Sequence, residues 1–214
     1  EALEAARLIV EAGAVYTRSD REPFFFTSGW ASPVFVDVKR LISIPQARKR
    51  LIELALVRIS ALFDTAWIDQ IAGCELAGVP YAAIIADRLE KPLVVALKQA
   101  RGFGRLSRFE GAFEPGARTL LLDDLTTDGR TKASVKHALI AAQAEVIGVF
   151  VLFDYAIFPV AERITSLATL ADILEAARED GGMDRRDLDI IAAFRADASA
   201  WSRQHGGIGA ELQA

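Results

Sequence analysis

One stretch of the chain decides its fold: Thr119-Leu120-Leu121-Leu122-Asp123-Asp124-Leu125-Thr126-Thr127-Asp128-Gly129-Arg130-Thr131. It begins with a short apolar run, typical of a strand, that ends in two adjacent acids. A loop of hydroxyl residues with one glycine then leads into a helix-like segment. This order places two carboxylates and a set of backbone N–H donors at the carboxyl end of one strand.

These groups suit a phosphorylated sugar. Paired carboxylates accept hydrogen bonds from neighbouring hydroxyls, and the N–H groups at a helix N-terminus bind phosphate. Gly129 lets the backbone adopt a positive φ and approach a ligand closely. The stretch lacks Gly-Lys-Ser/Thr and is therefore no Walker loop. The plainer alternative is an ordinary strand-to-helix connection in which Asp123 and Asp124 are solvated.

Strands and helices alternate on both sides of this stretch. Strand patterns cover residues 67–73, 93–97, 118–122 and 145–153, and helical patterns at 77–89 and 132–144 separate them. Strands that alternate with helices of this length predict an α/β fold with a mainly parallel sheet flanked by helices. Further helices are predicted at 46–63, 171–180 and 186–200, a short helical turn at 161–164, and a strand at 166–168.

We expect residues 1–214 to form one domain. Its parts are an N-terminal hood at 1–45, a core at 46–160 and C-terminal helices at 161–214. Two tryptophans are predicted to differ in their surroundings. We expect Trp67 to lie in the core, whereas Trp30 stands in a polar loop and is the aromatic side chain best placed to meet a ligand or a second subunit.

The composition argues against several classes of function. Because 29 acidic residues outnumber 25 basic ones, the net charge is −4, and a general nucleic-acid surface is not favoured. The longest apolar runs have the length of one strand, far short of the roughly 20 residues of a membrane helix. A lone cysteine, Cys74, forms no disulfide within the chain and suits a reducing cytoplasm. We therefore expect a cytoplasmic protein with no nucleic-acid or membrane partner.

A basic segment precedes the acid pair: Lys98-Gln99-Ala100-Arg101-Gly102-Phe103-Gly104-Arg105. It combines cations with glycines between two predicted strands. A flap that closes over phosphate groups needs this composition, although a solvated basic loop has it too.

Four segments together resemble the orotate phosphoribosyltransferases, a family of type I phosphoribosyltransferases. The stretch 119–131 resembles the signature that binds phosphoribosyl pyrophosphate (PRPP), and the basic segment resembles the catalytic flap. Residues 26–37 resemble the family's substrate segment, and Gly73-Cys74-Glu75-Leu76-Ala77-Gly78-Val79-Pro80 resembles its pyrophosphate-side turn. The segments occur in the family's order and spacing.

The resemblance implies the type I phosphoribosyltransferase fold and transfer of the phosphoribosyl group from PRPP to orotate. It implies that catalysis depends on Lys98, Arg101 and Asp124. It implies that PRPP is bound by Lys98, Arg101, Asp123, Asp124, Leu125, Thr126, Thr127, Asp128, Gly129, Arg130 and Thr131. It implies that orotate is bound by Phe35, Val36, Thr127 and Tyr155.

The same resemblance implies the cofactor and the assembly. Mg²⁺ is expected to be held mainly by PRPP, with no direct protein ligand. A homodimer is expected, with the flap of each chain reaching its neighbour's site.

Several positions depart from the family's pattern, and four of them bear on the flap and on the base. Leu97 and Arg101 replace flap cations, and an arginine cannot give up a proton as a lysine can. Thr27 and Tyr155 replace a lysine and an arginine that contact the substrate. Two alternatives follow: a PRPP-binding paralogue with weak or no catalysis, and a phosphoribosyltransferase for another base.

Overall fold

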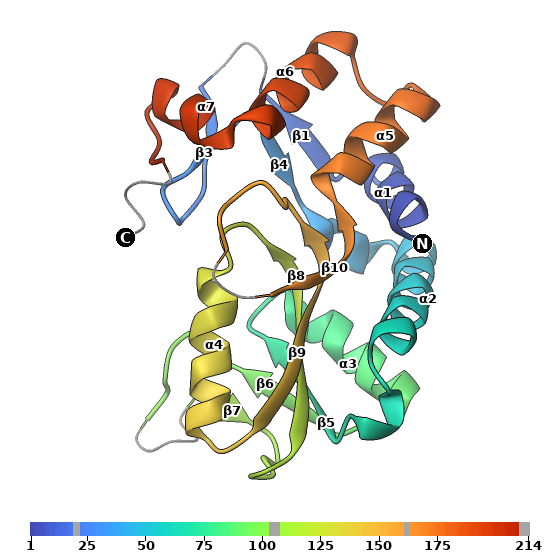
Figure 1. Cartoon of the computed structure of the whole chain (residues 1–214). Coiled ribbons are helices and arrows are strands. Elements are labelled where there is room, and N and C mark those ends of the chain that lie inside the picture. Colours follow the sequence, from blue (N-terminus) through green and yellow to red (C-terminus); the bar gives the residue numbers. More distant parts are fainter. Residues whose placement is uncertain (19–21, 103–107, 161–162, 210–214) are drawn as a thin grey trace.

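The structure is a computed structural model, and it describes residues 1–18, 22–102, 108–160 and 163–209. Its centre is a six-stranded sheet in the order β10-β9-β8-β5-β6-β7 (Figure 1). Neighbouring strands are parallel except β7, which is antiparallel to β6. The predicted mainly parallel sheet is confirmed. The strands are β5 (Gln70–Cys74), β6 (Leu93–Ala96), β7 (Phe109–Glu110), β8 (Arg118–Thr126), β9 (Glu145–Asp154) and β10 (Thr165–Thr169).

Helices cover both faces of this sheet (Figure 1). Side chains alternate along β8, so Leu120 and Leu122 join one apolar cluster and Leu121 joins the other. The first cluster packs under α2 (Pro45–Leu62) and α3 (Gly78–Leu89), and the second under α4 (Arg130–Ala141). In the described part of the chain, none of the helices is both long and apolar enough to cross a membrane.

A hood above the carboxyl ends of the central strands is built from both ends of the chain (Figure 1). Helix α1 packs against α5 and β10, and α7 packs against β3. Ala31 N donates to Ser202 Oγ at 2.9 Å, which joins the two ends. The elements are α1 (Ala2–Glu11), β1 (Val15–Thr17), β2 (Phe24–Phe25), β3 (Ala31–Ser32), β4 (Val34–Val36), the 3-10 helix η1 (Val38–Ser43), α5 (Leu170–Asp180), α6 (Arg185–Ala196) and α7 (Ala198–Gln204).

Several element boundaries differ from the sequence-based prediction. The helix predicted at 186–200 is two helices, because Asp197 leaves the helical conformation and its carboxylate accepts from Ala200 N. The start of the strand predicted at 67–73 is instead a short 3-10 helix, η2 (Thr65–Trp67). Of the helical turn predicted at 161–164, residues 161–162 lie outside the described residues, and residues 163–164 are not helical.

The expectations for Trp30 and Trp67 were wrong. Trp30 is fully buried, and its ring lies 4.7 Å from that of Phe158, between centroids. Trp67 is 63% exposed and carries the guanidinium of Arg118 over its ring. The polar residues around Trp30 gave no sign of this burial, because its partner is far away in the sequence.

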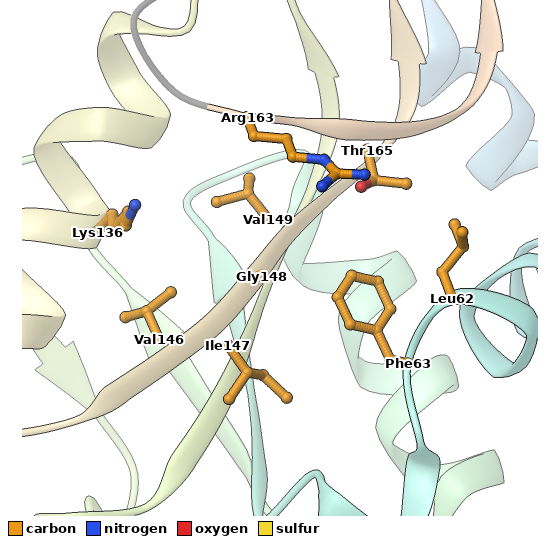
Figure 2. Close-up of a pocket in the computed structure, with 9 residues that line it drawn as sticks. All are labelled: Leu62, Phe63, Lys136, Val146, Ile147, Gly148, Val149, Arg163 and Thr165. Atoms are coloured by element: carbon orange, nitrogen blue, oxygen red, sulfur yellow. The ribbon is translucent and has the colours of Figure 1, made fainter.

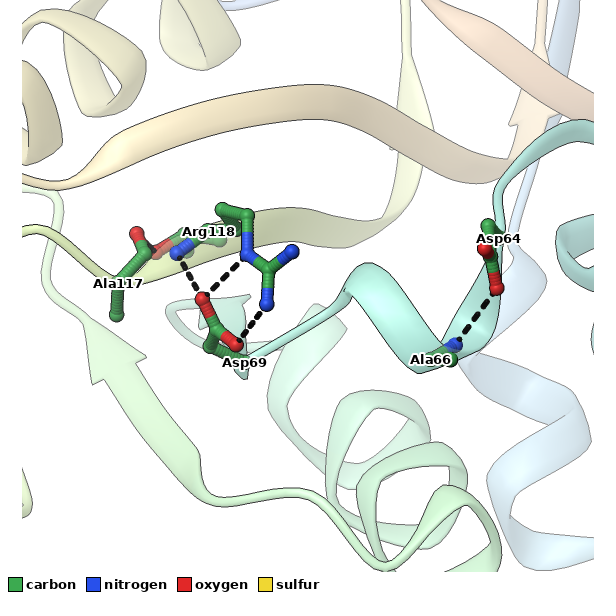
Figure 3. Close-up of polar contacts among 6 residues, drawn as sticks. Asp64, Ala66, Asp69, Ala117 and Arg118 are labelled. Carbon is green, nitrogen blue, oxygen red and sulfur yellow. Dashed lines mark hydrogen bonds and ion pairs between the residues drawn. The ribbon is translucent and has the colours of Figure 1, made fainter.

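A two-residue clamp ties β5 to the start of β8 (Figure 3). Asp69 N donates to the carbonyl of Arg118, and Arg118 N donates back to Asp69 Oδ2. The guanidinium adds bonds of 2.8 and 2.7 Å to the same carboxylate. These hydrogen bonds hold the pKa of Asp69 well below its usual value. The clamp fixes the register of the strand that carries the acid pair.

A second close fit joins β9 to the end of α2. Phe63 packs its ring against Gly148, beside a hollow of about 300 Å³ on the outer part of β9 (Figure 2). A Cβ at Gly148 would collide with that ring. The φ of Gly148 lies outside the left-handed region, so a glycine is not required there for its backbone conformation. It is required for the close packing of the ring against the strand.

Replacing Gly148 by alanine is expected to lower the free energy of unfolding by about 1–3 kcal/mol, because the ring and the strand must move apart. Chemical denaturation measures the change. The same substitution in a Phe63→Ala background serves as the control, since the obstacle is then absent. An equal penalty in both backgrounds would contradict this account of the glycine.

Candidate functional site

A cavity of about 1150 Å³ is lined both by residues of the hood and by the carboxyl end of β8. Three separate parts of the chain line it. The end of β8 and the loop after it contribute residues from Asp123 to Thr131, the hood contributes Phe24 to Thr27 and Phe35, and Glu75 and Lys98 lie at the third side. The cavity thus gathers most of the residues that the sequence singled out.

The two acids lie within β8, which runs on to Thr126, and not beyond its end as predicted. Alternation along the strand turns Asp123 toward α4 and Asp124 toward the opposite face. On the α4 side Lys132 Nζ lies 2.6 Å from Asp123 Oδ2, and both side chains are buried. The acid pair therefore has an internal counter-charge.

This pair governs the protonation of its neighbours. Burial and the charge of Asp123 raise the pKa of Asp124 to about 7. Burial opposes a charge on Lys132, but attraction to Asp123 outweighs it and raises the pKa of the ammonium. Burial, reinforced by Asp123, raises the pKa of the Cys74 thiol well above its usual value, which argues against a thiolate nucleophile. The site holds a fixed ion pair beside one carboxyl that titrates near neutral pH.

The loop after β8 leads into the N-terminus of α4. Gly129 has a φ of +75°, as its predicted role requires, and Thr127 and Thr131 line the cavity. Asp128 is turned toward its own loop: Oδ1 accepts from Arg130 N at 3.3 Å, and Oδ2 lies 3.4 Å from Arg130 Nε. Arg130 is exposed and is not among the residues that line the cavity.

Two hydrogen-bonded anchors hold the base of the basic segment. Glu75 accepts from Lys98 N and from the Arg101 guanidinium, each at 2.9 Å. The guanidinium of Arg108 donates to the carbonyls of Leu97 and Lys98. Lys98 lines the cavity, whereas Arg101 is exposed and does not. The predicted Gly104 and Arg105 lie outside the described residues.

Leu97 does not stand where a flap cation could act. Its side chain is 4% exposed, and its N–H donates to the carbonyl of Arg108 at 2.8 Å. An arginine here would bury a charge. This departure from the family's pattern therefore belongs to the anchor of the segment and not to its charged face.

Aromatic rings form the hood side of the cavity. Phe35 and Tyr155 line it, and the rings of Phe24 and Phe26 pack against Phe35. Val36 is fully buried and does not line the cavity. Its N–H donates to Tyr155 Oη at 3.0 Å and so already has a partner within the protein. Burial raises the pKa of the Tyr155 phenol, so it is neutral.

Sequence reasoning missed two residues of this site. Lys132 was the predicted first residue of a helix, and strand alternation combined with that position could have placed it beside Asp123. Glu75 was noted only within a turn, and nothing local pointed to its bonds with Lys98 and Arg101, more than 20 residues away. Among the described residues, no three or more acidic, histidine or cysteine side chains gather as a metal site.

The raised pKa of Asp124 gives a test in the free protein. The folded state keeps this proton up to about pH 7, whereas an unfolded aspartate releases it near pH 4. The stability that this carboxyl contributes therefore falls as the pH rises through that window. Chemical denaturation measures the free energy of unfolding of the unaltered protein and of Asp124→Asn at each pH. The value for the unaltered protein minus that for the variant is expected to fall by roughly 2–3 kcal/mol between about pH 5 and about pH 8.

Asp69→Asn is the matched control for this measurement. The pKa of Asp69 is lowered, so its contribution is constant across the same pH range and is lost only in acid. A difference between the unaltered protein and Asp124→Asn that does not change with pH would mean that Asp124 is ionised throughout.

Comparisons with known proteins identify the family, although no protein-family model matches the chain. The orotate phosphoribosyltransferase of Rhizobium rhizogenes is 38% identical over 217 residues, covering 97% of this chain and 92% of that protein. That of Dinoroseobacter shibae is 35% identical over 208 residues, covering 94% and 92%. Among solved structures, orotate phosphoribosyltransferase from Aeropyrum pernix has a TM-score of 0.67 at 28% identity, covering 84% of this chain and 99% of that one.

A second solved structure supports the fold. Leishmania donovani UMP synthase has a TM-score of 0.74 at 23% identity, covering 91% of this chain and 42% of that one. The fold is thus that of the type I phosphoribosyltransferases, as the acid pair and phosphate loop predicted. From the extent of its identity to these relatives, the chain belongs to the orotate phosphoribosyltransferase family.

Proposed function

We propose that this chain transfers the 5-phosphoribosyl group of PRPP to orotate, giving orotidine 5′-monophosphate and pyrophosphate in pyrimidine biosynthesis. One observation carries the proposal: a single cavity joins the buried acid pair and the loop at the N-terminus of α4 to an aromatic wall and to Lys98. It therefore offers groups for the sugar, the phosphates and a flat base side by side. We propose a cytoplasmic location and one functional unit over the whole chain.

The β8–α4 part is proposed to bind the ribose and its 5-phosphate. Asp124 accepts hydrogen bonds from the ribose hydroxyls when ionised, while Lys132 holds Asp123 in place. Backbone N–H groups at the start of α4 and the hydroxyls of Thr127 and Thr131 receive the phosphate. Asp128 also lines the cavity, and the nearby Arg130 guanidinium, 3.4 Å from Oδ2, offsets part of the charge that it brings toward that phosphate.

The opposite side is proposed to bind the base and the leaving group. The N1 nitrogen of orotate, which loses its proton to water, forms a bond to the anomeric carbon as the bond to the pyrophosphate oxygen breaks. Phe35 and Tyr155 border the base, and Val36 supports Tyr155 through its N–H. Lys98 neutralises the departing pyrophosphate, and a closed flap excludes water from the oxocarbenium-like transition state.

We propose that Mg²⁺ is held mainly by PRPP. When bound, it neutralises pyrophosphate charge. Among the described residues, Asp124 lies beside Asp123, whose carboxylate is already paired with Lys132. This arrangement fits a Mg²⁺ ion that contacts the protein through ribose hydroxyls and water better than one bound directly by carboxylates.

We also propose a homodimer in which the flap acts in trans. Lys98 lines the cavity of its own chain, but Arg101 points to Glu75 and lies outside that cavity. This exposed ion pair is weak enough, at about 0.2–1 kcal/mol, to be exchanged for a phosphate of a neighbouring site.

The purified protein is expected to consume orotate in the presence of PRPP and Mg²⁺. Asp124→Asn should lower kcat/KM by about 10- to 100-fold, because an amide is a poorer acceptor for ribose hydroxyls than a carboxylate. Orotate absorbance measures the rate. Asp189→Asn, an exposed acid of α6, is the matched control.

If PRPP binds but orotate is not consumed, the alternative of a PRPP-binding paralogue with weak or no catalysis is supported instead. The variant Arg101→Lys separates an active enzyme from such a paralogue, since it restores a lysine in the flap without disturbing the buried Leu97. A gain of about tenfold or more in kcat would show that the unaltered flap is impaired. A panel of orotate, uracil, hypoxanthine and adenine tests the alternative of another base.

Mixing two variants of strongly reduced activity tests the shared site. Arg101→Ala lacks the flap cation and Asp124→Asn lacks the sugar acceptor. In hybrid dimers with flaps in trans, one of two sites has both groups, so activity should recover to about a quarter of the unaltered value. Each variant refolded alone is the control. A mixture that stays as inactive as its components would show that Arg101 serves its own chain.

A further inference from the structure

Orotate differs from uracil by a carboxylate, and this group needs a partner. The inference below rests on the proposed function. A carboxylate that enters a cavity walled by aromatic rings loses hydration, and this loss is offset only by a cation or by several hydrogen-bond donors. The base side of this cavity must therefore supply such a group.

The two positions expected to supply it are neutral in this chain. Thr27 and Tyr155 both line the cavity and stand where the family resemblance places a lysine and an arginine. Tyr155 Oη already accepts from Val36 N and lies 3.5 Å from the carbonyl of Val34. Neither side chain brings a positive charge to the base.

The described cations that line the cavity are Arg18, Lys39, Lys98 and Lys132. Lys132 is buried against Asp123, and Lys98 lies beside Glu75 at the base of the flap. These two belong to the sugar and leaving-group side. Arg18 and Lys39 stand on the hood, where the aromatic rings are.

Lys39 is better placed than Arg18 to reach the base. It lies on η1, directly after the strand that carries Phe35, and its ammonium is 5.5 Å from the centroid of the Phe35 ring. By contrast, the Arg18 guanidinium lies over the ring of Phe24 and already donates to the carbonyls of Glu22 and Pro23, which hold it away from Phe35.

We propose that Lys39 binds the carboxylate of orotate and is a specificity-determining residue of this chain. Asp37 Oδ1 lies 2.9 Å from its ammonium and orients it, which leaves further N–H groups to donate into the cavity. The side chain is 54% exposed, so the ammonium remains hydrated until the base arrives. Charge-assisted hydrogen bonds to the carboxylate then favour orotate over uracil.

The test compares two nucleotides that differ only in this carboxylate. Orotidine 5′-monophosphate and uridine 5′-monophosphate are titrated calorimetrically into the full chain. Lys39→Gln should weaken binding of the first by about 10- to 100-fold and change the second less than about twofold. Lys39→Arg should retain the preference, and in turnover Lys39→Gln should raise the KM for orotate with little change in kcat or in the KM for PRPP.

Arg18→Gln is the matched control, because it removes the other hood cation. A loss of preference in Arg18→Gln but not in Lys39→Gln would overturn the assignment. So would equal weakening of both nucleotides in Lys39→Gln. If the unaltered protein binds PRPP and prefers orotidine 5′-monophosphate, but Lys39→Gln keeps that preference, this inference fails and the proposed function stands. If the unaltered protein binds neither PRPP nor orotidine 5′-monophosphate, both fail.

Discussion

The buried ion pair between Lys132 and Asp123 is the interaction on which the site depends. It lies where the central strand β8 meets the first turn of α4, so it joins the acid-pair side of the cavity to the loop that follows β8. Breaking such a pair by removing one partner typically costs about 3–5 kcal/mol, because the other charge is left buried. With the pair intact, Asp123 contributes a fixed negative charge, and Asp124 becomes the carboxyl whose protonation responds to pH near 7.

Around this pair, the cavity depends on contacts between distant segments. The hood is made from both ends of the chain, and its aromatic wall is tied to the sheet through Tyr155 and the backbone of β4. The clamp between Asp69 and Arg118 fixes the register of β8 from the other end. The aromatic wall and the acid pair are thus positioned by separate contacts that meet at one cavity.

The flap combines firm anchors with a weakly held cation. Leu97 and Arg108 are joined by hydrogen bonds at the base of the segment, while Arg101 is held by one exposed ion pair to Glu75. An exposed pair of this kind contributes little stability. Leu97 is buried within the anchor, whereas Arg101 keeps a positive charge on the exposed part of the segment.

The sequence by itself determined the parallel sheet, the acid pair at its carboxyl edge and the positive φ of Gly129. These follow from periodicity and turn chemistry, which neighbouring residues encode. Most of the residues predicted for the site line the cavity. The burial of Trp30, the ion pair of Lys132 and the bond from Val36 to Tyr155 were decided only by the tertiary structure. In each case the partner is placed by packing between elements, so no local pattern in the chain specifies it.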